Sequence, residues 1–156
     1  KTPQAPFWHV VLRLKGESDP AARQLIVQRA EVFPDLSGEI ANAMASDDVG
    51  IRAAVVEFMG LSKRREPAWG GALVLAMERL AAQFESEESL RSHALMAEFA
   101  PELERLLAAT AWFPETDFTA PTAALRAMVQ AKPPDADRER ALSALAQRRT
   151  EPQRRP

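Results

Sequence analysis

Residues 34–60 read PDLSGEIANAMASDDVGIRAAVVEFMG, and this stretch decides the fold class. In each half, apolar residues recur three or four positions apart, which is the spacing of one face of a helix. Between the halves lies Ser46-Asp47-Asp48, a polar break that can cap the helix after it. The stretch therefore predicts a helical hairpin. Its apolar faces consist of Leu36, Ile40, Ala43 and Met44 in the first half and Ile51, Ala54, Val55, Phe58 and Met59 in the second.

Upstream of this hairpin the sequence predicts two further helices. The first begins at Pro6 and ends near Gly16. Apolar residues at every second position from 8 to 14 leave a strand as the competing interpretation of this segment. The second is capped by Ser18 or Asp19 and runs from Pro20 to about Val32. Its helically spaced residues are Ala22, Leu25, Ile26 and Arg29.

Downstream, Pro67 opens the helix with the longest apolar stripe, which ends near Phe84. Ser86 starts another helix, and Pro101 is expected to break or kink the path after it. Residues 112–121 combine aromatic residues with proline and predict an ordered loop packed on the body. Two last helices are expected over residues 121–131 and, with Asp135 as cap, up to about residue 149.

The composition agrees with one soluble, all-α domain of about eight or nine helices. The chain has 156 residues, 46% hydrophobic and 27% charged, with 12 Pro against 6 Gly. We expect a linker at residues 1–5, a single helical domain over residues 6–149 and a disordered tail at 150–156. The start at Lys1 is typical of a processed or truncated chain. Composition selects neither cytoplasm nor periplasm.

Several function classes find little support in the residues. Without Cys or Tyr and with only His9 and His93, the inventory for catalysis is poor, so we expect no catalytic, metal-binding or cofactor-binding residues. No apolar run is long enough to span a bilayer. Residues 1–131 carry a net charge of −5 and residues 132–156 a net charge of +3, which argues against nucleic acid as the partner.

The run from Asp48 to Gly60 resembles the second helix of a HEAT or armadillo-type repeat. The resemblance lies in an acidic turn, a β-branched residue followed by Arg52, then small residues, and finally a large apolar residue before Gly60. Ser89-Leu90-Arg91 is a weaker second copy. The resemblance implies a short α-solenoid of stacked hairpins, with Asp48 and Arg52 in a ladder of contacts between neighbouring turns. A compact helical bundle is the alternative fold.

The resemblance further implies a non-catalytic domain that binds a segment of another protein in a groove lined by the second helix of each hairpin. A different function class stays open: a bundle that senses a small apolar ligand in a cavity between the helix of Trp69 to Phe84 and that of Leu90 to Phe99. An enzyme is a third class, and the sequence leaves the oligomeric state open. The predicted partner-binding residues are Arg52, Glu57, Lys63, Arg64, Arg65, Arg91 and Glu98.

Overall fold

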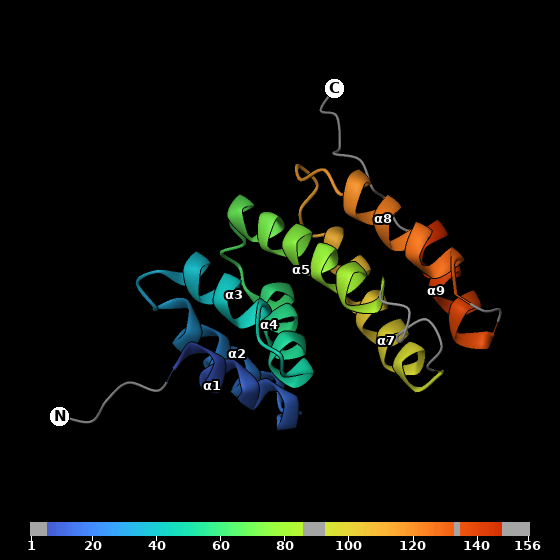
Figure 1. Cartoon of the computed structure of the whole chain (residues 1–156). Coiled ribbons are helices and arrows are strands. Elements are labelled where there is room, and N and C mark those ends of the chain that lie inside the picture. Colours follow the sequence, from blue (N-terminus) through green and yellow to red (C-terminus); the bar gives the residue numbers. More distant parts are fainter. Residues whose placement is uncertain (1–5, 86–92, 133–134, 148–156) are drawn as a thin grey trace. The chain divides into compact units, whose positions relative to one another are not determined.

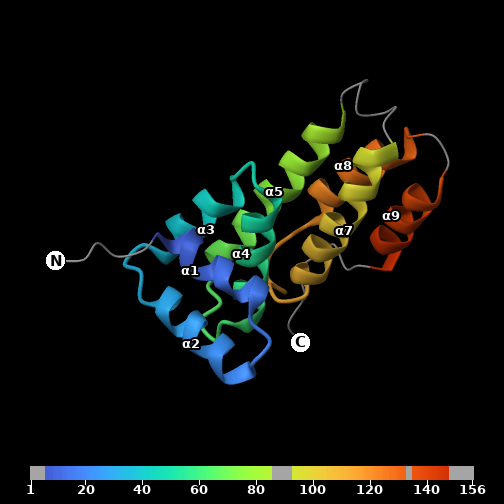
Figure 2. The ribbon, with the colours of Figure 1, turned by 90° about the horizontal axis from the view of Figure 1, so that it is seen from below.

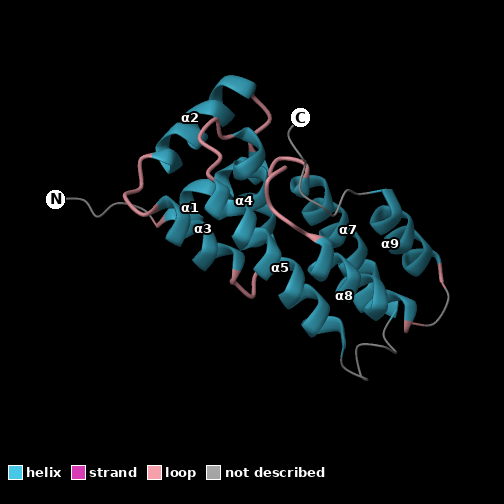
Figure 3. Cartoon of the chain, turned by 90° about the horizontal axis from the view of Figure 1, so that it is seen from above, coloured by secondary structure: helices cyan, strands magenta, loops and turns pink. Residues whose placement is uncertain are grey.

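A computed structural model of the chain describes residues 6–85, 93–132 and 135–147. Within these ranges it consists of eight α-helices, one 3-10 helix and loops, without a strand (Figure 3). The predicted all-α class is therefore confirmed. The packing of the helices is compatible both with a compact bundle and with a solenoid.

The chain divides into two compact units, residues 1–72 and residues 73–156. The division falls inside helix α5, Pro67–Glu85, drawn in green in Figure 1. The single domain expected over residues 6–149 stays a prediction.

The first unit begins with helix α1, Phe7–Leu12, which continues into the 3-10 helix η1, Arg13–Gly16. The helix expected from Pro6 to Gly16 is thus confirmed over the strand. Three helices follow, and α1 contacts all of them (Figure 2). Their bounds are Pro20–Glu31 for α2, Leu36–Met44 for α3 and Val49–Leu61 for α4.

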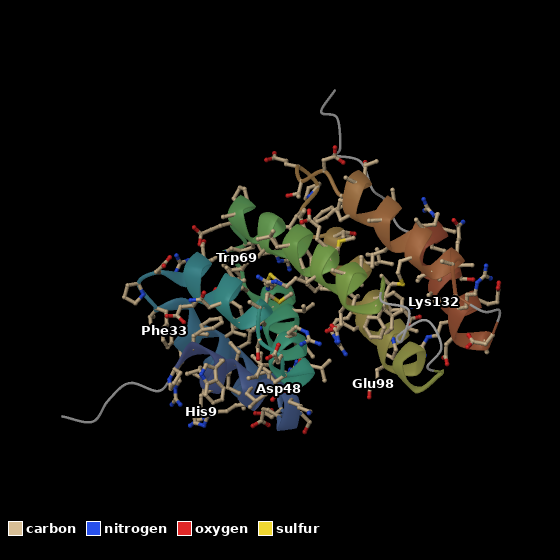
Figure 4. The ribbon with its side chains drawn as sticks, in the orientation of Figure 1. His9, Phe33, Asp48, Trp69, Glu98 and Lys132 are labelled. Carbon is tan, nitrogen blue, oxygen red and sulfur yellow. The ribbon has the colours of Figure 1, made fainter. Side chains whose placement is uncertain are left out.

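Aromatic side chains form the core of this unit. Phe7 meets Phe33 and Phe58 edge to face, with ring centroids 5.6 Å and 5.5 Å apart. Phe58 also contacts the fully buried Trp69, whose ring centroid lies 5.7 Å away. Edge-to-face pairs contribute about 0.5–1.5 kcal/mol beyond the burial of their area. Residues from α1, the α2–α3 loop, α4 and the start of α5 are held together in this way (Figure 4).

Aspartate side chains cap three helices of the first unit. Asp19 accepts from the backbone N–H of Ala22 at 3.1 Å, and Asp48 accepts from that of Gly50 at 2.8 Å. These caps were expected, and together α3, the turn and α4 form the hairpin predicted over residues 34–60. Helix α3 begins at Leu36 rather than at Pro34, because Asp35 supplies its cap by accepting from Gly38 N–H.

The second unit contains the rest of α5 together with helices α7, α8 and α9, which run over His93–Thr110, Thr119–Gln130 and Ala136–Gln147. Helix α9 packs against both α7 and α8. Asp135 caps α9 as expected, accepting from Arg138 N–H at 2.7 Å. The predicted loop packs on the body through Phe113 and Phe118, which are buried. Helix α8 begins at Thr119, two residues before the expected Pro121.

Pro101 was expected to break or kink the path, and the break is wrong, because helix α7 continues through this residue; the kink stays a prediction. A proline inside a helix costs about 3 kcal/mol, since it lacks an N–H and crowds the preceding turn. Its neighbours Phe99 and Leu103 are fully buried. Burial of one such side chain contributes about 1.5–3 kcal/mol, so the two together are of the size needed to offset the cost of the proline.

Some predictions lie outside the described residues. These are the linker at residues 1–5, the helix start at Ser86, the weaker repeat around Arg91 and the tail at residues 150–156.

Candidate functional site

Two of the predicted partner-binding residues, Arg52 and Glu57, already have partners within the first unit. Arg52 Nη1 donates to the carbonyl oxygen of Ser46 at 2.7 Å, across the turn before its own helix. Glu57 forms an ion pair with Arg23 of α2. Both side chains are half-buried. They contribute to the packing of α2, α3 and α4, and their role toward a partner stays a prediction.

The basic run Lys63-Arg64-Arg65 follows α4, and its two arginines donate hydrogen bonds to carbonyl oxygens at the ends of helices. Arg64 donates through Nη1 to the carbonyl oxygen of Glu31, at the end of α2. Arg65 donates to the carbonyl oxygens of Met59 and Gly60 at 3.0 Å and 2.7 Å, in the last turn of α4. Cations at helix C-termini are stabilising, because carbonyl groups there lack intrahelical partners. Lys63, the first residue of this run, is exposed.

The remaining two predicted residues, Arg91 and Glu98, belong to the second unit. Glu98 is exposed on α7 of the second unit (Figure 4). Arg91 lies outside the described residues. A groove formed by all seven residues therefore stays a prediction.

The alternative ligand cavity was expected between α5 and the helix that contains Phe99. At one point along these helices the space is filled, because the rings of Phe84 and Phe99 meet with centroids 5.0 Å apart. Both side chains are buried, as are Trp69 and Met77 of α5. These residues act as core.

Few titratable groups in the described ranges are perturbed. Burial lowers the pKa of Lys132, whose side chain is only 3% exposed and donates to the carbonyl oxygen of Phe84. Hydrogen bonds from the side chain and backbone of Thr119 lower the pKa of the exposed Asp117. A hydrogen bond to Glu104 raises the pKa of Arg140. These groups lie at helix ends or in an exposed ion pair.

The described residues contain neither a cluster of metal ligands nor a membrane-spanning helix. No group of three or more His, Cys, Asp or Glu side chains is arranged to hold a metal ion. Among the described helices, none combines the length and apolar character needed to cross a bilayer.

The outer face of α2 has an unusual surface. Leu25 is 57% exposed within α2, and Val32, which directly follows the last residue of the helix, is 70% exposed; Leu25 lies on the side of the helix opposite the buried Ala30. Two exposed uncharged residues, Ala21 and Gln28, share that side. We call these four residues, Ala21, Leu25, Gln28 and Val32, the α2 strip.

The sequence did not predict this strip, because Leu25 and Ile26 were expected on one apolar face. In the structure the inner face of α2 is made instead by Ile26, Val27 and Ala30, beside Arg23 and its ion pair to Glu57. With these residues turned inward, Leu25 faces outward. A signal was nevertheless present, since the α2 strip repeats at intervals of four, three and four residues.

Comparisons of the chain with protein-family models, with curated proteins and with solved structures found no match.

Proposed function

We propose that this chain is a non-catalytic protein-interaction module and that the α2 strip is its contact surface. The observation that carries the proposal is the exposure of Leu25 and Val32 on one helix face whose central positions bear no charge. Interface centres are depleted of charged residues in the same way, whereas an ordinary solvated helix face carries charged side chains.

The proposal agrees with the expectation that second helices of hairpins bind the partner. Helix α2 is the second helix of the pair that precedes the hairpin of residues 34–60, and it contacts α1 and α4. In α4, Arg52 and Glu57 are engaged in contacts within the chain. The contact surface is thus assigned to α2, while membership of the HEAT or armadillo class remains part of the proposal.

The test is affinity capture from a lysate of the source organism, with proteins identified by mass spectrometry. The wild type is compared with a Leu25→Glu/Val32→Glu variant and with a control, Leu75→Glu. Leu75 is a suitable control because it is 52% exposed on α5, far along the chain from the α2 strip. Circular dichroism checks that each variant is folded.

We expect a protein captured by the wild type and the control to be lost by the double variant. Full burial of each apolar side chain is worth about 1.5–3 kcal/mol, and each 1.4 kcal/mol is about tenfold in affinity, so the loss is at least tenfold. Equal capture by all three forms would contradict the assignment of the surface. Capture of nothing specific would remove the proposal of an interaction module.

A further inference from the structure

We draw no further inference here: the strongest candidate, the surface patch on α1 and η1 that carries the exposed side chains of Trp8, His9 and Arg13, supports none because nothing in the structure shows what covers it.

Discussion

Arg23 extends from the second turn of α2 and donates Nη1 to two carbonyl oxygens, those of Leu14 at 2.9 Å and Glu17 at 2.7 Å. Its Nη2 pairs with the carboxylate of Glu57 on α4. One planar guanidinium thus joins η1, the loop after it, α2 and α4. An ammonium group has neither this shape nor this reach.

We expect Arg23→Met to lower the free energy of unfolding by about 2 kcal/mol, because two carbonyls and a carboxylate lose a charged donor. Arg23→Lys should recover only part of this loss. Urea unfolding followed by circular dichroism measures the effect. The control is Arg29→Met on the same helix, where an exposed side chain without an ion pair in the described residues should change stability by no more than about 0.5 kcal/mol. Equal losses for the two would contradict this role of Arg23.

Lys132 should make the stability of the chain depend on pH. Its pKa is lowered from 10.5 in the folded chain by burial, so between the lowered value and 10.5 the unfolded chain binds more protons than the native one. The free energy of unfolding should therefore rise as the pH is raised through this window. Below the window the cost of burying the ammonium group is constant.

The chain is well suited to this measurement, because it contains no Tyr and no Cys and has only four lysines. Urea unfolding is followed from neutral pH to pH 10.5 in the wild type and in Lys132→Met. The variant should lose the rise while keeping any contribution of the other lysines. An identical pH dependence in both proteins would show that Lys132 is not the group responsible.

At the scale of the element, two helical glycines differ in what a methyl group would meet. A Cβ on Gly71, in α5, would meet no atom within 4 Å apart from its chain neighbours and the backbone of its own helix, whereas a Cβ on Gly38, in α3, would collide with the carboxylate of Asp35. That carboxylate caps α3 through Gly38 N–H. The same substitution should thus have different effects in two helices.

Gly71→Ala should stabilise the chain by about 0.5–1 kcal/mol, because alanine restricts the unfolded chain and favours the helix. Gly38→Ala should gain little, because the displaced cap costs about 1 kcal/mol. In a chain with Asp35→Ala, the Gly38→Ala change should recover its full gain. Thermal unfolding compares the wild type with Gly71→Ala and Gly38→Ala, and Asp35→Ala with Asp35→Ala/Gly38→Ala. Equal gains at both glycines in the otherwise wild-type chain would count against the cap as the cause.

Helix starts were the most predictable elements. Asp135 caps the helix for which the sequence named it, and Asp19 and Asp48 each came from a short group of candidates, since a side chain that accepts from the next turn acts locally. Pro101 shows the opposite case. Because proline disfavours the interior of a helix, the sequence predicted a break or a kink there. The burial of Phe99 and Leu103, which depends on distant residues, keeps α7 continuous.

At the scale of the whole molecule, the sequence predicted the all-helical class but not the division into two compact units. The division at residues 72 and 73 lies within α5, whose apolar stripe runs on from Trp69 to Phe84 without a linker or a change of composition. The α2 strip was missed for a related reason. Which side of α2 turns inward involves contacts with residues distant in the chain, such as that of Arg23 with Glu57, 34 residues away.

The positions of the three tryptophans give the two units separate spectroscopic reporters. Trp69, fully buried, and Trp8, exposed by 42%, belong to the first unit, while the half-buried Trp112 belongs to the second. Indole fluorescence shifts to longer wavelength when the ring enters water, and this chain has no tyrosine emission to overlap it. Variants that retain only Trp69 or only Trp112 would therefore show, without any added label, whether the two halves of the chain melt together or one after the other.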